Sequence, residues 1–203
     1  MRKIKTVIIG CGNITGLNEK DKSRIKPATH IGALKRNSKF KLCGVYDLDK
    51  TKSDKFQRIF NVKSFMSIKD LIIDNRAEFV VVAVPYKENL RVFKEILKFK
   101  SNIKYIFCEK PMSYSYISAK KIDNLCRKKK VRLFINNRRL DYGIQKLKKI
   151  ASEKKLGKLN YIEGRCSSGL YALGIHLIDT ISYISDHKYN FLFHSHDMFK
   201  KKS

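Results

Sequence analysis

The stretch Lys5-Thr-Val-Ile-Ile-Gly-Cys-Gly-Asn-Ile-Thr-Gly16 decides the fold. The four apolar or β-branched residues before Gly10 predict a buried parallel strand that runs into a tight turn. Gly10 permits that turn, and Gly12 lets the backbone approach a pyrophosphate, toward which the next helix would direct its N-terminal amides. The third glycine of this dinucleotide motif is replaced by Thr15, so the stretch alone also fits a glycine-rich turn without a ligand.

Size and composition indicate a globular protein. The 203 residues, 43% of them hydrophobic, are enough for one domain and part of another. The longest apolar run, residues 79–85, is far shorter than the roughly 18 residues of a membrane span. The first residues lead into a strand too early for a signal peptide. The five cysteines are scattered without a Cys-x-x-Cys pair, which favours reduced thiols in the cytoplasm.

The net charge is strongly positive, +27 from 45 Lys+Arg and 18 Asp+Glu. Such a field attracts nucleic acid or anionic lipid. The excess is mostly lysine spread over the predicted helices, with short clusters at 127–130 and 200–202, and no nucleic-acid motif accompanies it. We therefore favour a lysine-rich composition over a nucleic-acid-binding face, and an anionic substrate agrees with either.

A polar insertion, residues 17–27, separates the glycine turn from a predicted helix of about ten residues. That helix starts at Ala28 after a proline and brings His30 near the turn. The second strand, 41–47, ends on Asp47. In dinucleotide-binding folds an acid at this place accepts hydrogen bonds from the adenine ribose hydroxyls.

Asp47 bears on the choice of cofactor. Its carboxylate would repel a 2′-phosphate, which favours NAD over NADP. Lys50 and Lys52 follow closely and keep NADP as an alternative. A helix cap is the other interpretation of Asp47.

Strands and helices continue to alternate as far as residue 135. This order predicts an α/β fold with a doubly wound parallel sheet of about six strands. Pro85 ends one strand where a nicotinamide-binding loop would lie, and Glu109-Lys110-Pro111 follows the next. The predicted helices are 49–60, 67–74, 87–100 and 114–129, and the further strands are 62–65, 78–85, 104–108 and 131–135.

The second part, residues 136–203, opens with Asn136-Asn-Arg-Arg139. The pattern predicts a helix over 141–155, a strand over 158–166, a loop over 167–174 and a helix over 175–184. The tail residues His187, His194, His196 and Asp197 resemble a metal cluster. No predicted strand or helix sets their spacing, so we predict no metal site.

Four segments in this order resemble the Gfo/Idh/MocA oxidoreductases, the relatives of glucose–fructose oxidoreductase and inositol dehydrogenase. They are Gly10-Cys-Gly-Asn-Ile14, Glu109-Lys-Pro111, Asn136-Asn-Arg-Arg139 and Gly174-Ile-His-Leu-Ile-Asp179, and the resemblance covers about residues 4–184. It implies an N-terminal NAD(P)-binding Rossmann domain, 1–135, and an incomplete α/β (α+β) substrate and oligomerisation domain, 136–203. It also implies hydride exchange between NAD(P) and a hydroxyl-bearing carbon of a sugar, nucleotide sugar or cyclitol.

The resemblance assigns roles to particular residues. Lys110 matches the catalytic lysine that takes the hydroxyl proton, although it is also one of many surface lysines. His176 matches a histidine that polarises the reacting oxygen, with a structural helix-start histidine as the alternative, and Asp179 would hold its ring. Arg138, Arg139 and Asp179 are candidate substrate residues. The two arginines could instead face solvent, and Asp179 could instead be structural. The cofactor-binding residues would be Gly10, Gly12, Asn13, Ile14, Asp47, Pro85 and Glu109. Glu109 would orient either the nicotinamide ribose or Lys110, with a strand-end charge of no further role as the alternative.

Two departures from the family pattern keep other functions open. Many relatives carry Asp or Asn four residues before His176, where this chain has Ala172. The part after the 175–184 helix is also much shorter than a complete sheet domain, which suggests a truncation, a frameshift or completion by a partner. The alternatives to a dehydrogenase are a dinucleotide-binding remnant without catalysis and, on charge alone, a basic nucleic-acid-binding protein.

Overall fold

The computed structural model describes residues 2–155, 157–167 and 169–186. The chain divides into two compact units, with the boundary between Asn136 and Asn137. Among the described residues, no helix has both the length and the apolar character needed to cross a bilayer.

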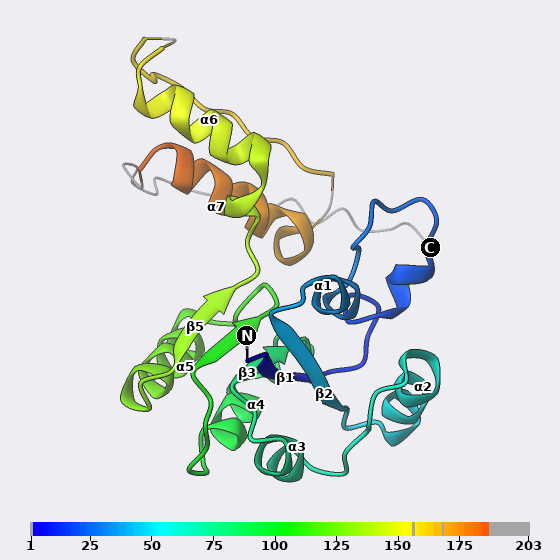
Figure 1. The fold of residues 1–203 in the computed structure, drawn as a ribbon. Coiled ribbons are helices and arrows are strands. Elements are labelled where there is room, and N and C mark those ends of the chain that lie inside the picture. The colour runs from blue at the N-terminus through cyan, green and yellow to red at the C-terminus, as the bar shows by residue number, and fades with distance from the viewer. Residues whose placement is uncertain (1, 156, 168, 187–203) are drawn as a thin grey trace, which may run out of the picture. The chain divides into compact units, whose positions relative to one another are not determined.

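The first unit is a five-stranded parallel sheet with helices on both faces (Figure 1). The strand order β2-β1-β3-β4-β5 confirms the predicted doubly wound α/β fold. The strands are β1 (Ile4–Ile9), β2 (Phe40–Tyr46), β3 (Phe79–Val82), β4 (Tyr105–Cys108) and β5 (Arg132–Ile135), and the helices are α1 (His30–Arg36), α2 (Lys50–Phe60), α3 (Ile68–Asp74), α4 (Asn89–Ile96) and α5 (Tyr116–Lys128).

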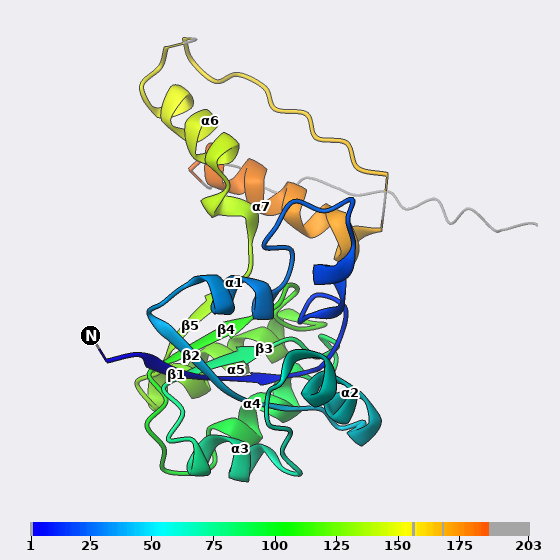
Figure 2. The same cartoon turned by 45° about the vertical axis from the view of Figure 1, so that its right-hand side comes forward.

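Two hydrophobic cores cover the two faces of the sheet, because alternate residues of a strand point to opposite sides. Val80 and Val82 of β3 belong to a core that includes buried residues of α3, α4 and α5. Val81 belongs to the other core, with Ile31 of α1 and Phe56 of α2. Figure 2 shows α1 on one side of the strands and α3 and α4 on the other.

The sheet has one strand fewer than predicted. Residues 62–65 form only an isolated bridge, in which Ser64 pairs with Val45 of β2. Val62 and Phe65 are buried and gave this segment the apolar pattern of a strand. Ser67 then accepts the backbone N–H of Asp70 and starts α3, which leaves no length for a full ladder.

Capping residues set where the helices begin. α1 starts at His30 rather than Ala28, because the Thr29 hydroxyl accepts the backbone N–H of Gly32 at 3.1 Å. α2 is capped by Asp49, whose side chain accepts the N–H of Thr51 at 3.0 Å, so the cap interpretation belongs to Asp49 and not to Asp47.

The connection from β1 to α1 also differs from the expectation. Residues after Gly12 make a helical turn, with the Gly16 N–H on the Gly12 carbonyl, and lead into a 3₁₀ helix, Leu17–Lys20 (η1). Glu19 then accepts the backbone N–H of Ala28 at 3.0 Å and the hydroxyl of Thr29 at 2.8 Å. The insertion is therefore fastened to the start of α1, and a short turn replaces a helix at the glycines.

The second unit contains two helices that lie side by side, α6 (Tyr142–Ser152) and α7 (Ile175–Ile184) (Figure 1). A 3₁₀ turn, Arg138–Leu140 (η2), precedes α6, and a π-helical turn, Leu170–Gly174 (η3), replaces the predicted loop. Residues 158–166 form no strand, because none of the described residues pairs with their backbone. The tail histidines and Asp197 lie outside the described residues.

Candidate functional site

The residues that follow the five strands stand in register along the carboxyl edge of the sheet. The backbone N–H of Gly10 donates to the Tyr46 carbonyl at 2.8 Å, and that of Glu109 donates to the Val82 carbonyl at 2.9 Å. Equivalent bonds join Ala83 to the Ile9 carbonyl and Asn136 to the Cys108 carbonyl, each at 2.8 Å. In sheet order the row reads Asp47, Gly10, Ala83, Glu109 and Asn136. Three of the predicted cofactor residues therefore lie along one edge, where parallel sheets bind ligands.

Gly10 and Gly12 serve different purposes in the turn after β1. Gly10 has φ +101°, and a Cβ there would lie 2.4 Å from the carbonyl oxygen of Ala83, which follows β3. Only glycine fits that position. A Cβ on Gly12 would meet nothing within 4 Å, so its backbone is open to an approaching group. The turn thus needs Gly10 for its own geometry and leaves Gly12 accessible.

Thr15 stands where the motif expects its third glycine, and its side chain explains the exchange. The fully buried hydroxyl donates to the Gly10 carbonyl at 2.7 Å and closes the turn. Gly16 takes over the close-packing role, since a Cβ there would lie 2.7 Å from the ring of Phe60 in α2. The shifted glycine therefore reflects different packing of the same kind of turn.

The carboxylate of Asp47 binds backbone on both sides. Oδ2 accepts the N–H of Cys11 at 2.7 Å, and Oδ1 accepts the N–H of Asp49 at 2.9 Å. Each carboxylate oxygen has two lone-pair directions, so each retains one for a further donor such as a ribose hydroxyl. Asp47 is therefore held in place by the backbone and still has free acceptor positions for a ligand.

The remaining predicted cofactor residues lie on the surface near these turns. Asn13 and Ile14 are exposed, and the Ile14 carbonyl accepts the backbone N–H of His30 at 3.1 Å. Pro85 is exposed after β3, and its carbonyl accepts the N–H of Glu88 at 2.8 Å. Their backbone is fixed while their side chains face outward.

Glu109 is the most constrained acid of the row, with only 13% of its side chain exposed. Oε1 contacts Nε2 of His30 at 2.8 Å and accepts from Nδ2 of Asn136 at 2.7 Å. Burial raises the pKa of Glu109, but the hydrogen bonds from His30 and Asn136 outweigh it, so the pKa lies below its usual value. Glu109 is therefore an ionised carboxylate that holds three segments together.

Lys110 follows directly and is half-buried. Its backbone N–H also hydrogen bonds to the Glu109 carboxylate. The Lys110–Pro111 peptide is cis, and Pro111 is buried. The lysine thus begins at the carboxyl end of β4, beside the row of strand-end residues.

The two thiols nearest the row of strand-end residues, Cys11 and Cys108, are buried. Burial raises the pKa of Cys11, which lies inside the glycine turn, to about 12. Burial also raises the pKa of Cys108, at the end of β4, to about 12. Thiols of this kind stay protonated and unreactive at neutral pH. Among the described residues, no group of three or more His, Cys, Asp or Glu side chains is arranged to hold a metal ion.

The second unit pairs two of the predicted substrate residues with each other. Arg139 donates from Nε to both oxygens of Asp179 at 2.9 Å, and from Nη2 to Oδ1 at 2.6 Å. Asn137 adds a bond to Oδ1 at 3.0 Å, and the Asp179 side chain is only 10% exposed. This pair fastens η2 to α7, so Asp179 has a structural partner, Arg139, that the sequence pattern did not identify.

The other predicted residues of this unit are more open. Arg138 is 62% exposed and lies 3.6 Å from Asp141, the cap of α6. His176 is half-buried on the first turn of α7, three residues before Asp179. Ala172 is exposed within η3, and its methyl group offers neither a donor nor an acceptor.

The sequence pattern predicts His30 near the glycine turn but not its contact with Glu109. It also gives no individual role to Asn136, which donates to the same carboxylate. Asn136 could have been found, because residues that follow neighbouring parallel strands meet at one edge. The His30 contact depends on the path of the 17–27 insertion, for which the residue pattern holds no signal.

The edge fits a dinucleotide. Gly12 leaves backbone open for close approach, and Asp47 retains acceptor capacity for ribose hydroxyls. Glu109 and Lys110 stand two strands away from Gly10, across β3. Gly12 would therefore lie against the pyrophosphate, Asp47 against the adenine ribose, and Glu109 and Lys110 toward the reacting end.

Comparisons with known proteins agree with this fit. The family described as "Oxidoreductase family, NAD-binding Rossmann fold" (GFO_IDH_MocA) matches residues 4–137. The glucose-6-phosphate 3-dehydrogenase of Bacillus subtilis is 28% identical over 91% of this chain and 54% of its own length. An uncharacterised oxidoreductase of Schizosaccharomyces pombe is 30% identical over 59% of this chain and 37% of its own.

Solved structures show the same fold. The WlbA dehydrogenase of Bordetella pertussis, in complex with NADH and UDP-GlcNAcA, superposes with a TM-score of 0.71 at 20% identity, over 90% of this chain and 58% of that one. The chain spans about half the length of these solved structures and of the curated relatives that match most of it. The chain belongs to the Gfo/Idh/MocA oxidoreductase family, whose N-terminal part is an NAD-binding Rossmann fold.

Proposed function

We propose that the first unit binds NAD(H) along the carboxyl edge of its sheet and supports hydride exchange with a hydroxyl-bearing carbon of a sugar-type substrate. The observation that carries the proposal is the row in which Gly10, Asp47 and Glu109 follow β1, β2 and β4 in register. The proposed cofactor residues are Gly10, Gly12, Asn13, Ile14, Asp47, Pro85 and Glu109.

The residues of the chain would handle the proton, while bound NAD supplies or accepts the hydride. Oxidation of a carbinol also releases the hydroxyl proton, and Lys110 is the proposed base. His176 is the proposed group that polarises the reacting oxygen. Arg138, which is exposed, is the proposed substrate contact, and the Arg139–Asp179 pair holds the turn that carries it.

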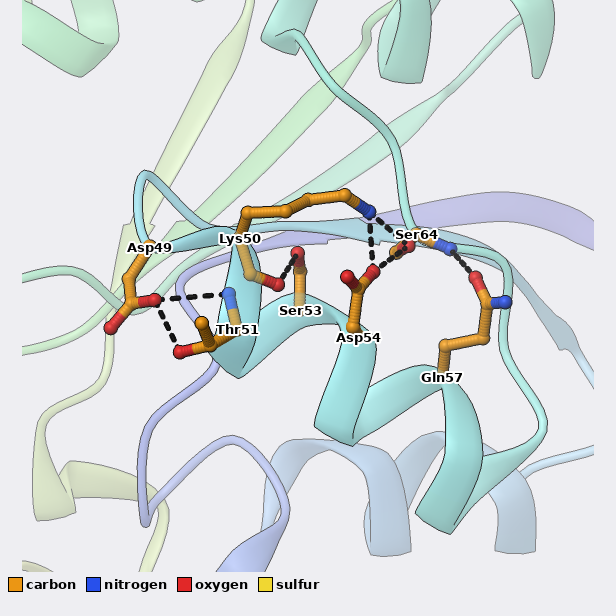
Figure 3. A network of polar contacts seen from close by, with 7 residues as sticks. All are labelled: Asp49, Lys50, Thr51, Ser53, Asp54, Gln57 and Ser64. Atoms are coloured by element: carbon orange, nitrogen blue, oxygen red, sulfur yellow. Dashed lines mark hydrogen bonds and ion pairs between the residues drawn. The ribbon is translucent and has the colours of Figure 1, made fainter.

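NAD is the preferred cofactor in this proposal. Asp47 would repel a 2′-phosphate, and the two lysines that could counter it are engaged elsewhere. Lys50 reaches along α2 to Asp54 and the hydroxyl of Ser64 (Figure 3). Lys52 lies 3.7 Å from the carboxylate of Asp49. Surface pairs of this kind are weak, so the charge of Asp47 is the main argument.

The substrate class follows from charge and relatives together. One relative is named for a phosphorylated sugar, and one solved neighbour holds a nucleotide sugar. The net charge of +27 would steer such anions to this chain faster than neutral polyols. We therefore place phosphorylated and nucleotide-linked sugars ahead of neutral sugars and cyclitols.

The test is an assay with NAD⁺ or NADP⁺ and a panel of neutral sugars, sugar phosphates, nucleotide sugars and cyclitols, followed at the nicotinamide absorbance band. The proposal predicts turnover in the wild type. Lys110→Ala should lower kcat by about 10²- to 10⁴-fold while NADH binding is kept. Turnover that is unchanged in Lys110→Ala would contradict the role of this lysine.

A second candidate is a dinucleotide-binding protein without catalysis. The observation that favours it is Ala172, whose side chain supplies no polar atom in the turn before His176. Both candidates predict NADH binding, and only the first predicts turnover. Restoring the family residue as Ala172→Asp separates them further, since a gain in turnover would show that the remaining site is competent.

The two units would have different roles in the enzyme. The first unit would hold the cofactor, and the second would carry substrate and subunit contacts. Exposed apolar residues of the second unit, Leu170, Leu173 and Ile178, support a homo-oligomeric interface there. Light scattering of the purified protein would test the assembly.

The cysteines support a reducing, cytoplasmic location, because Cys11, Cys43, Cys108 and Cys126 are thiols in the structure.

A further inference from the structure

His30 connects two turns that are far apart in sequence, one through its backbone and the other through its side chain. Its backbone N–H donates to the Ile14 carbonyl at 3.1 Å, within the segment that follows the glycine turn. Its ring reaches Oε1 of Glu109 at 2.8 Å, directly before Lys110. One residue therefore bridges the proposed cofactor turn and the loop that carries the proposed base.

The bridge is shielded from water. The side chains of His30 and Glu109 are 11% and 13% exposed. The His30 ring also stands edge-on to Phe107 of β4, with 5.7 Å between ring centroids. A hydrogen bond to an ionised, nearly buried carboxylate is stronger than one at the surface, so this contact resists displacement by solvent.

Glu109 passes the constraint to its neighbours. Asn136, after β5, donates to the same Oε1 at 2.7 Å, and the backbone N–H of Lys110 hydrogen bonds to the same carboxylate. The backbone of Lys110 is therefore linked through the Glu109 carboxylate to His30 of α1 and to Asn136 after β5. Loss of the His30 contact would free the side of this loop that faces the glycine turn.

We propose that His30 is a positioning residue, which acts through Glu109 to hold Lys110 at a fixed place relative to the glycine turn. The catalytic consequence rests on the proposed function, whereas the restraint on Lys110 can be tested without any substrate or cofactor. A misplacement of about 1 Å at a reacting group costs up to about 10²-fold in rate, so the effect falls on kcat rather than on cofactor affinity.

The matched variants are His30→Met and His30→Gln. Both side chains are unbranched and fill the site, but only the glutamine amide can donate to Glu109. In the protein without cofactor, the acetic anhydride labelling rate of Lys110, measured by mass spectrometry, should rise several-fold in His30→Met and stay near wild type in His30→Gln. Lys3, exposed before β1 at the opposite edge of the sheet, is the internal control and should label equally in all three.

Activity gives the second readout. His30→Met should lower kcat by about 10- to 100-fold with the KM for NAD within about threefold, and His30→Gln should recover most of the loss. Equal Lys110 labelling in His30→Met and wild type would overturn the restraint. A wild type that binds no NADH would overturn the proposed function, while the labelling without cofactor still decides the restraint. If His30→Met fails to fold, Asn136→Ala removes the other side-chain donor to Glu109 and should give the same rise in labelling.

Discussion

The carboxylate of Asp47 accepts the backbone N–H of Cys11 at 2.7 Å, which joins the end of β2 to the glycine turn after β1. The acid that would select the cofactor is thus part of the turn that would bind its phosphates. This arrangement fixes the acid before any ligand arrives, so little ordering is left for binding to impose.

Asp47→Asn tests cofactor selection. The substitution removes the charge that would repel a 2′-phosphate and weakens the bonds to the ribose hydroxyls. We expect NADH to bind about 10-fold more weakly, and NADPH to gain relative to NADH, in fluorescence titrations. Asp123→Asn is the matched control, because Asp123 pairs with Arg127 on the surface of α5, away from β2, and it should leave the ratio of the two affinities unchanged. If the ratio of the NADH and NADPH affinities were unchanged in Asp47→Asn, Asp47 would not distinguish the two riboses.

Gly10→Ala and Gly12→Ala should differ in stability. Alanine at position 10 must adopt φ +101° and pushes its Cβ against the Ala83 carbonyl, so we expect a loss of at least about 2 kcal/mol in the free energy of unfolding. Alanine at position 12 points into open space and should leave the melting temperature within about 2 °C of wild type. Thermal unfolding followed by circular dichroism checks both. Equal melting temperatures would show that the β1 turn is not built as described.

Thr15→Val tests the residue that replaces the motif's third glycine. Valine keeps the shape but leaves the Gly10 carbonyl without its 2.7 Å hydroxyl donor in a fully buried place. The expected cost is about 1–3 kcal/mol in urea unfolding. Thr15→Ser keeps the hydroxyl and should lose less. If Thr15→Val were as stable as the wild type, the Thr15 hydroxyl would not stabilise the turn.

Glu109 predicts a dependence of stability on pH. Its folded-state pKa is depressed below the ordinary value of about 4.5, mainly by His30 and Asn136 acting against burial. A depressed carboxyl pKa stabilises the fold above the unfolded-state pKa, and this contribution is lost as pH falls through the folded-state value. The wild type should therefore exceed Glu109→Gln in stability at pH 7 and lose that advantage below about pH 4.5. Urea titrations of both proteins across pH 3–7 measure it, and a constant difference would contradict it.

Local signals in the sequence were sufficient for much of the fold. The predicted helix 67–74 begins at Ser67, the residue that caps α3, because cap residues act within one turn of their own position. The buried strand before Gly10 was recognised from its unbroken apolar run. The strand and turn patterns place Gly10 and Asp47 after β1 and β2, and the family resemblance singles out Lys110 after β4. Parallel topology brings these strand ends to one edge.

What failed depended on partners distant in sequence. The segments 62–65 and 158–166 have strand-like patterns, but a strand forms only where another strand offers its backbone, and no local pattern encodes that. The Arg139–Asp179 pair and the His30–Glu109 contact join residues 40 and 79 positions apart. Such contacts follow from the path of the intervening chain rather than from the residues themselves.

The most direct test of the central claim, that a nicotinamide dinucleotide lies over the glycine turn, is a calorimetric titration of NADH into wild type and Gly12→Ala. The account predicts saturable binding to the wild type with one site per chain. It also predicts a loss of about 10-fold or more in Gly12→Ala, whose fold should be intact. Equal affinity in the two proteins, or no binding to the wild type, would contradict it.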